Sequence, residues 1–346
     1  MKIHLIGAIG ALTLGFTERG DEQVFCHTTN KACNSLGVID FRRPGLLDNH
    51  KQGFLHNILC QSWVGARISH NRIQRTGEVT EQRLLCRFIA IGDMGTGKDG
   101  QYKVAQAIAA VCAERGCDFA IGLGDNIYEA GADSSNDIQF EMKFEQPYRQ
   151  LDFPFYMTLG NHDNSWLVGG DGLNNDKGEA QVEYHYKRDR LSNKWHMPAR
   201  YYNFTAPKGD VQPLVEFFSL DSNPLAAVAD ADPEYWQLPY RDKQQRWLDV
   251  ELQDSNAPWK IAFAHHAFIS NGKHGNAGMY DGFPGAGVIY YNMLKKHVCD
   301  RVDVMIAGHD HDLQWLKPVD KCGKTFHIVS GAGGKTRELK NKDNNP

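Results

Sequence analysis

The sequence contains no Cys-x-x-Cys pair, although it has eight cysteines among its 346 residues. Cysteines at that spacing are typical of zinc ribbons and thioredoxin-like redox sites, so neither class is indicated. The even number permits disulfides without showing any, and the cysteines are too sparse for a disulfide-rich scaffold. A chain of this length can bury a large core without a structural metal. We therefore expect any bound metal to serve chemistry.

The sequence also lacks a surplus of basic residues and an apolar run long enough to span a membrane. The formal net charge is −4, which argues against nucleic acid as a partner because phosphate backbones select basic surfaces. An anionic substrate must then be attracted by a local site. The apolar run over residues 3–16 is too short for an ordinary transmembrane helix. It is typical of the apolar part of a signal peptide, although no Ala-x-Ala cleavage site follows, and an apolar strand or helix is the alternative.

Residues 17–83 lack regularly spaced apolar side chains and are rich in Arg, His, Asn and Gly. Together with the apolar start, they predict a poorly ordered N-terminal extension over residues 1–83. The histidines and early cysteines of this stretch fit no ligand spacing, so we expect no metal site there. The pattern changes at residue 84, and we expect one catalytic domain over residues 84–346.

Short apolar runs that end in small and polar residues recur through this domain. They are typical of buried β-strands and occupy residues 84–93, 117–125, 153–163, 214–221, 259–266, 302–311 and 326–333. Helical spacing of apolar residues predicts helices over 102–116, 241–254 and 289–300. Strands that alternate with helices indicate an α/β fold, in which ligands collect where strand ends meet loops.

Carboxylates, imidazoles and one amide occur at the ends of five of these strands. They are Asp93, Asp125, Asn161-His162, His265-His266 and His309-Asp310-His311. A single histidine after one strand is most often a hydrogen-bonded loop residue. Five such endings in chain order indicate a metal site instead.

Residues 92–98, GDMGTGK, also fit part of a phosphate-binding P-loop. Two features oppose that interpretation. Asp99 follows where a Ser or Thr would hold magnesium, and Asp93 puts a carboxylate inside the loop that would surround phosphate. We therefore expect no nucleotide-binding loop and no separate cofactor-binding residues.

The strand-end series resembles the purple acid phosphatases, most of all their small, tartrate-resistant type, within the calcineurin-like metallophosphoesterases. The resemblance covers residues 85–335 and includes KWHMPARYY at 194–202 and GHDHDLQW at 308–315. It implies a four-layer sandwich of two β-sheets flanked by helices. Family members usually continue with further strands beyond the place where this chain stops, so we expect an open, apolar sheet edge near residues 326–346.

The resemblance also implies two metal sites that share one carboxylate. The first would use Asp93, Tyr128, His311 and bridging Asp125, and the second would use Asn161, His265, His309 and the same Asp125. Most metallophosphoesterases place a histidine where this chain has Gly95, and Tyr128 makes up for that ligand. A phenol has a pKa near 10 and ligates only when a strong Lewis acid displaces its proton. We therefore expect Fe(III) at the first site and divalent Fe, Zn or Mn at the second.

His162 and His274 are the expected groups for proton transfer and phosphate binding, while His266 and His185 are expected to be structural or peripheral. Asp163 is expected to orient a neighbouring imidazole. The leading hypothesis is a phosphomonoesterase with an acidic optimum, in which a metal-bound hydroxide attacks phosphorus. A phosphodiesterase or nucleotide hydrolase on the same site is the alternative, decided by loops at 164–200 and 271–287.

A catalytically silent binding protein is the third hypothesis, and the presence of all seven ligands disfavours it. The expected substrates are small phosphorylated molecules, with phosphoproteins and nucleotides as further candidates. The expected location is secreted, periplasmic or in a lysosome-like compartment.

Overall fold

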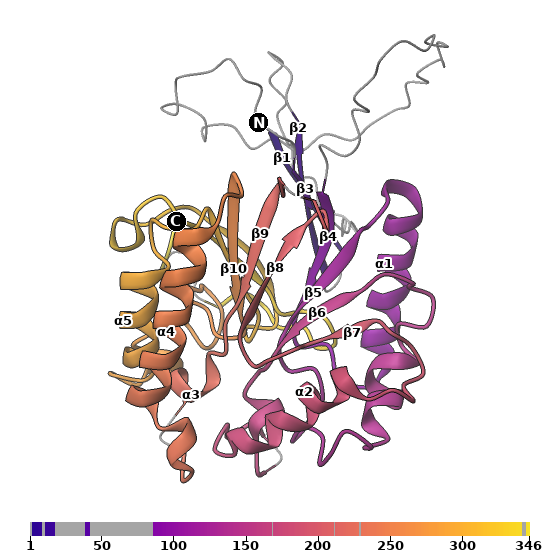
Figure 1. Ribbon diagram of the computed structural model, residues 1–346, viewed down its shortest axis with the longest axis horizontal. Coiled ribbons are helices and arrows are strands. Elements are labelled where there is room, and N and C mark those ends of the chain that lie inside the picture. The colour runs from indigo at the N-terminus through magenta and orange to yellow at the C-terminus, as the bar shows by residue number, and fades with distance from the viewer. Residues whose placement is uncertain are drawn as a thin grey trace.

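Four layers make up the part of the chain that the structure describes: helices, a β-sheet, a second β-sheet, and helices again (Figure 1). The computed structural model describes residues 2–8, 11–17, 39–41 and 86–346, apart from 168, 211, 228–229 and 341–343. The predicted poorly ordered extension over residues 1–83 lies outside these ranges, apart from residues 2–8, 11–17 and 39–41. Within the described ranges, no helix combines the length and the apolar character that crossing a bilayer requires.

The first sheet is built around four parallel strands: β4 (Cys86–Ile91), β5 (Phe119–Leu123), β6 (Phe155–Thr158) and β7 (Trp195–His196). Three strands from the N-terminal part extend it: β1 (Lys2–Ala8), β2 (Ala11–Thr17) and β3 (Ile39–Phe41). Helices α1 (Asp99–Arg115) and α2 (Glu179–Tyr186) cover its outer face. The strands are apolar on both faces because both faces are covered.

The second sheet has the strand order β12-β13-β11-β10-β9-β8. Its members are β8 (Tyr202–Ala206), β9 (Val215–Ser219), β10 (Trp259–Ala264), β11 (Val304–Ala307), β12 (Leu313–Leu316) and β13 (Phe326–Ser330). Helices α3 (Asn223–Ala226), α4 (Gln237–Asp254) and α5 (Val288–His297) cover the outer face. Short helical turns complete the fold at Glu141–Glu145, His162–Asn164, Asn175–Gly178, Pro233–Tyr235, Tyr280–Gly282 and Asp320–Cys322.

Aromatic side chains fill the space between the two sheets. Phe88 and Phe119 of the first sheet stand edge-on to Phe217 of the second, with ring centroids 4.9 and 5.3 Å apart. Ile261 and Phe263 of β10 are fully buried in the same layer. Each such side chain stabilises the fold by about 1.5–3 kcal/mol. This inner layer fixes the two sheets against each other and therefore fixes the relative positions of their strand ends.

The predicted α/β fold and its two helix-flanked sheets are confirmed, and each predicted strand and helix overlaps one in the structure. The prediction of an open edge near residues 326–346 is wrong for the described residues. β13 pairs with β11 on one side and with β12 on the other. Asn345 is buried, and its side-chain amide donates to Asn271 Oδ1 at 2.8 Å. The final residues thus pack back onto the domain.

Among the described residues, two disulfides tie the ends of helices to segments that lead into strands. Cys112 at the end of α1 pairs with Cys117, and Cys299 after α5 pairs with Cys322. The sequence permitted disulfides, but it gave no means to choose these pairs. Both bonds lie in the catalytic domain, where they close the connections into β5 and β13.

His327 on β13 should lower the free energy of unfolding as the pH falls. Burial first, and then the charge of Lys321, lower its pKa to about 3, whereas an unfolded histidine titrates near 6.5. Between these values the unfolded chain binds the extra proton, so stability is lost as pH falls from about 6.5 toward 3, by up to about 5 kcal/mol. We expect His327→Phe to flatten the dependence of the free energy of unfolding on pH in this range, measured by urea denaturation. Equal slopes for both proteins would contradict the assignment.

Candidate metal centre

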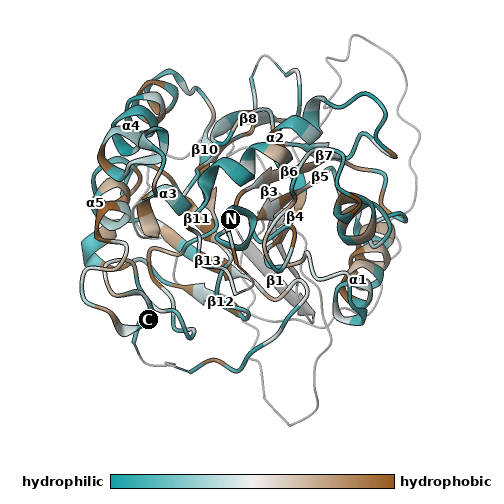
Figure 2. Cartoon of the chain, turned by 90° about the horizontal axis from the view of Figure 1, so that it is seen from below, coloured by the Kyte–Doolittle hydropathy of each residue, from teal (hydrophilic) through white to brown (hydrophobic). Residues whose placement is uncertain are grey.

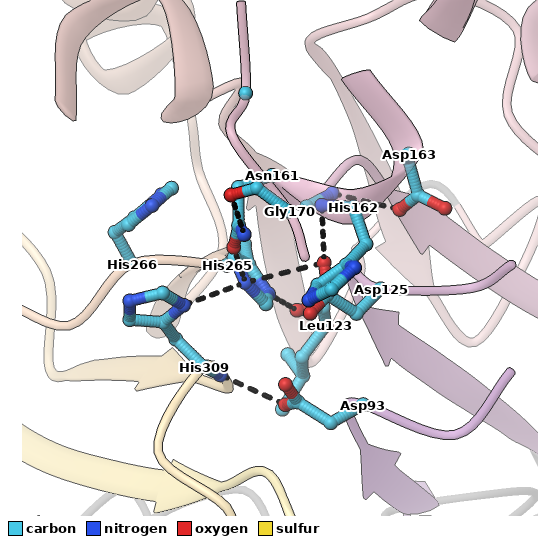
Figure 3. A network of polar contacts seen from close by, with 12 residues as sticks. Asp93, Leu123, Asp125, Asn161, His162, Asp163, Gly170, His265, His266 and His309 are labelled. Atoms are coloured by element: carbon cyan, nitrogen blue, oxygen red, sulfur yellow. Dashed lines mark hydrogen bonds and ion pairs between the residues drawn. The ribbon is translucent and has the colours of Figure 1, made fainter. Parts of the chain in front are cut away.

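The five strand-end segments meet at one edge of the two sheets. The strands concerned run parallel to their neighbours, so their carboxyl ends open at the same edge. The next segment along the chain supplies a metal-type ligand in each case: Asp93 after β4, Asp125 after β5, Asn161 after β6, His265 after β10 and His309 after β11. Figure 3 shows these side chains gathered around one centre.

Three of these residues have a left-handed backbone. The φ angles of Asp93, Asp125 and His309 are 57°, 53° and 69°. Residues with a side chain rarely adopt this conformation, and each instance costs on the order of 1–3 kcal/mol. Such strain concentrates at functional sites, and here it falls on the first ligand-type residue of three separate loops.

Two glycines allow these loops to approach one another. A β-carbon at Gly95 would lie 1.8 Å from the carbonyl oxygen of Asn126, so another residue fits only if that loop moves. Gly124 has a φ of 84°, and a β-carbon there would lie 2.7 Å from His265 Nδ1. Close packing between the loops after β4 and β5 thus leaves no room for a side chain at position 95.

Asp93, Tyr128 and His311 form the first group of ligand atoms. The Tyr128 hydroxyl donates to Asp93 Oδ1 at 3.0 Å and lies 3.2 Å from His311 Nε2. His311 Nε2 lies 3.3 Å from the same carboxylate oxygen. Three loops therefore bring three ligand atoms within reach of one ion.

The second group is centred on His265 Nε2. This atom lies 2.9 Å from Asn161 Oδ1 and 3.0 Å from His309 Nδ1. It also lies 3.5 Å from Asp125 Oδ1. The Tyr128 hydroxyl of the first group interacts with Asp125 as well, so this carboxylate adjoins both groups.

Burial raises the free energy of ionised side chains in this centre. It raises the pKa of the Asp93 carboxyl and of the Tyr128 hydroxyl well above their usual values. Burial also opposes ionisation of Asp125, but the imidazoles of His265 and His162 outweigh it and lower the Asp125 pKa to about 2. A bound cation would relieve the cost of ionising the first two groups.

The imidazoles of His309 and His311 favour the neutral form that binds metal. Burial lowers the pKa of His309 well below the usual value, and lowers that of His311 to about 4. The donor set thus consists of neutral imidazole nitrogens, carboxylates, an amide oxygen and a phenol. It contains no side chain with a fixed positive charge. This donor chemistry fits a pair of borderline or hard metal ions.

Backbone carbonyls hold two of the ligands in orientation. His265 Nδ1 lies 2.8 Å from the carbonyl oxygen of Leu123, which leaves Nε2 for the centre. The Asn161 side-chain amide donates to the carbonyl oxygen of Gly170 at 2.8 Å, so its oxygen faces His265. Such outer contacts fix ring orientation and raise the basicity of a ligating histidine.

Asp163 does not orient an imidazole, and that expectation is wrong. Its carboxylate accepts hydrogen bonds from the backbone N–H groups of Asn126, Ile127 and Gly160 and from the side chain of Gln181. The buried carboxylate therefore ties the loop after β5 to the loop after β6. It positions two ligand-bearing loops relative to each other.

His162 and His274 lie on different sides of the centre. The backbone N–H of His162 donates to Asp125 Oδ1 at 3.0 Å, while its ring Nδ1 lies 2.6 Å from the carbonyl oxygen of Glu129. The His274 ring centroid lies 4.2 Å from that of His309. Both rings therefore border the ligand groups without belonging to them.

His266 and His185 differ in their distance from the centre. The His266 ring lies 4.5 Å from that of His309, but its Nδ1 faces the Ser222 hydroxyl at 2.8 Å. Its ligand atom lies within 4.8 Å of those of His265 and His309, closer to the centre than the sequence indicated. His185 lies away from the centre, with Nδ1 3.4 Å from the carbonyl oxygen of Trp195.

Two cationic residues beside the centre were missed in the sequence. Lys335 Nζ lies 3.6 Å from the centroid of the Tyr128 ring, and an Arg337 guanidinium nitrogen lies 2.9 Å from His274 Nε2. One signal could have indicated them: β13 is parallel to β11, so residues that follow it emerge at the same edge as the ligands.

Comparison with known proteins assigns the class. Residues 86–313 match the family model of the calcineurin-like phosphoesterases. The chain belongs to this family. Among its relatives it is similar to purple acid phosphatase 7 of Arabidopsis thaliana, with 30% identity over 72% of this chain and 70% of the relative. It is also similar to tartrate-resistant acid phosphatase type 5 of Sus scrofa, with 27% identity over 75% and 73% of the two chains.

A solved structure supports the fold alone. It is the GAP50 anchor in the inner membrane complex of Plasmodium, with a TM-score of 0.57, 20% identity and coverage of 74% of each chain. The resemblance to the purple acid phosphatases is thus confirmed by the sequence relatives, and the layered architecture by this structure.

Proposed function

We propose that this protein is a dinuclear metal-dependent acid phosphatase that hydrolyses phosphate monoesters. The observation that carries the proposal is the convergence of seven ligand-type side chains from both sheets at one edge, with Asp125 adjoining two groups. Its relatives named acid phosphatases support the same activity. Phosphorylated small molecules are the proposed substrates.

In this proposal, Asp93, Tyr128 and His311 hold Fe(III), and Asn161, His265 and His309 hold a divalent ion, with Asp125 shared. Two bound cations lower the pKa of water and neutralise charge on phosphate oxygens. The phenol of Tyr128 favours the trivalent ion because burial already opposes its ionisation. The carbonyl contacts of His265 and Asn161 keep their ligand atoms turned inward before any ion binds.

His162 and His274 are proposed to transfer protons at the edge of the centre. We expect His162→Ala and His274→Ala each to lower kcat by about 10²–10⁴-fold, because general acid–base catalysis contributes that much. Neither side chain is a proposed ligand, so elemental analysis should find the metal content unchanged. His185→Ala, at a histidine away from the centre, is the control. If His274→Ala leaves kcat, KM and the pH profile unaltered, its assignment is wrong.

The function itself is tested by purifying the full chain and measuring its metals and its substrate preference. We expect two metals per chain, one of them iron, and faster hydrolysis of p-nitrophenyl phosphate than of bis-p-nitrophenyl phosphate. A preference for the diester would favour the phosphodiesterase alternative. Active protein with a single zinc, or without metal, would contradict the dinuclear proposal.

The disulfides support a location outside reducing compartments. Disulfides persist in secreted, periplasmic and lumenal proteins and are rare in the cytosol, and this domain has two of them. We propose that the protein is secreted, periplasmic or held in a lysosome-like compartment. Mass spectrometry of protein from its native host, alkylated before lysis, would test this through the redox state of Cys299 and Cys322.

A further inference from the structure

The chain after β13 crosses the rim of the metal centre. The backbone N–H of Arg337 donates to the carbonyl oxygen of His311 at 2.7 Å. Lys335 lies over the Tyr128 ring, and its Nζ is 3.4 Å from both carboxylate oxygens of Glu129. This short segment therefore places two cations beside the proposed ligands, one near each group.

The two cations differ in how their charge is balanced. Lys335 pairs with Glu129, and the guanidinium of Arg200 likewise pairs with Asp221. Arg337 forms no ion pair of this kind among the described residues: its side-chain hydrogen bond is to His274 Nε2, at 2.9 Å, and the carboxylate of Asp312 interacts with it only at longer range. His274 directs its other nitrogen to Asp281 Oδ1 at 2.7 Å. The guanidinium is exposed, and most of its N–H donors remain free for a ligand.

The position of Arg337 relates it to the substrate. The ring of its imidazole partner His274 is tilted against that of His309, a proposed ligand of the second ion, with ring centroids 4.2 Å apart. A phosphoryl group bound at the ions would thus have Arg337 one imidazole ring away. That separation suits a neighbouring anionic group better than the reacting one. A guanidinium matches phosphate oxygens with two parallel hydrogen bonds.

We propose that Arg337 is a specificity-determining residue that recognises a second phosphoryl group on the substrate. The favoured substrates would then carry a diphosphate, as inorganic pyrophosphate and nucleoside diphosphates do. This inference rests on the proposed phosphatase function, because it assumes that the first phosphoryl group binds at the ions. Lys335 contributes less, since Glu129 already balances its charge.

The test compares two inhibitors on the metal-loaded enzyme. Inhibition constants for inorganic phosphate and for pyrophosphate are measured against p-nitrophenyl phosphate hydrolysis, and their ratio is the readout. We expect Arg337→Gln to weaken inhibition by pyrophosphate about tenfold more than inhibition by phosphate, because one charge-assisted interaction is lost at an exposed site. Arg337→Lys keeps the charge but lacks the planar guanidinium with its parallel N–H donors. Its ratio of inhibition constants should lie between those of the wild type and Arg337→Gln. A general loss of activity does not change this ratio.

Arg115→Gln is the matched control. Arg115 ends α1, at the opposite edge of the first sheet, and is paired only with its neighbour Glu114, so its removal should leave the ratio as in the wild type. An unchanged ratio in Arg337→Gln overturns the inference while the phosphatase function stands. Failure of the wild-type chain to hydrolyse the monoester overturns the proposed function, and this inference with it.

Discussion

Asp125→Ala should abolish phosphatase activity and empty both metal sites. Asp125 is the proposed shared ligand, because its carboxylate lies near His265 of the second group and interacts with Tyr128 of the first. Its loss removes a fully ionised carboxylate, whose pKa is about 2, from each site at once. We expect kcat/KM for p-nitrophenyl phosphate to fall by more than about 10⁴-fold, equivalent to roughly 5 kcal/mol of transition-state stabilisation.

Elemental analysis and steady-state kinetics on the same preparation check this result. Asp125 has a left-handed backbone that asparagine tolerates better than alanine, so Asp125→Asn separates loss of charge from loss of loop conformation. Asp133→Ala removes an exposed carboxylate that pairs with Lys177, and should change nothing. Two metals retained in Asp125→Ala would show that this residue is not shared.

Tyr128→Phe should remove the visible absorption of the iron-loaded protein. A phenolate bound to Fe(III) gives a charge-transfer band, and Tyr128 is the only phenol among the residues of the centre. The ring is buried and would remain packed as phenylalanine. The variant should therefore stay folded while it loses both the colour and one of the four ligands of the first ion.

Absorption spectra before and after iron loading measure the effect, with circular dichroism to verify folding. Tyr148→Phe is the control, because Tyr148 is equally buried but lies in the core under α1, away from the centre. Its spectrum should match that of the wild type. A band that persists in Tyr128→Phe would assign the phenolate to another tyrosine.

The strand ends could be predicted because apolar runs and polar endings are local properties of the sequence. Asp93 and His309 were found in this way, since each follows a buried strand directly. Their convergence depends on parallel strands within each sheet and on the packing of the two sheets against each other. The ligand set and the α/β architecture therefore came from periodicity and from the family resemblance together.

The features that could not be predicted from the sequence depend on contacts between distant segments. The role of Asp163 could not be predicted, because its partners Asn126 and Gln181 lie on other elements. The place of Arg337 beside His274 depends on the path of the chain after β13. The expectation of an open edge was wrong for the same reason. β12 is too short and too mixed in polarity to be predicted as a strand, but it pairs with β13.

The packing at Gly95 constrains how this enzyme could evolve. The family resemblance places a histidine there in most metallophosphoesterases, and exchanging Tyr128 for such a histidine takes two substitutions. Here a β-carbon at position 95 would lie 1.8 Å from the Asn126 carbonyl oxygen. The exchange would require the β5 loop, with Asp125 and its left-handed backbone, to be rebuilt as well. A single substitution at position 95 would therefore disturb the loop that carries the proposed shared ligand, so loop packing as well as ligand chemistry ties the proposed first site to Tyr128.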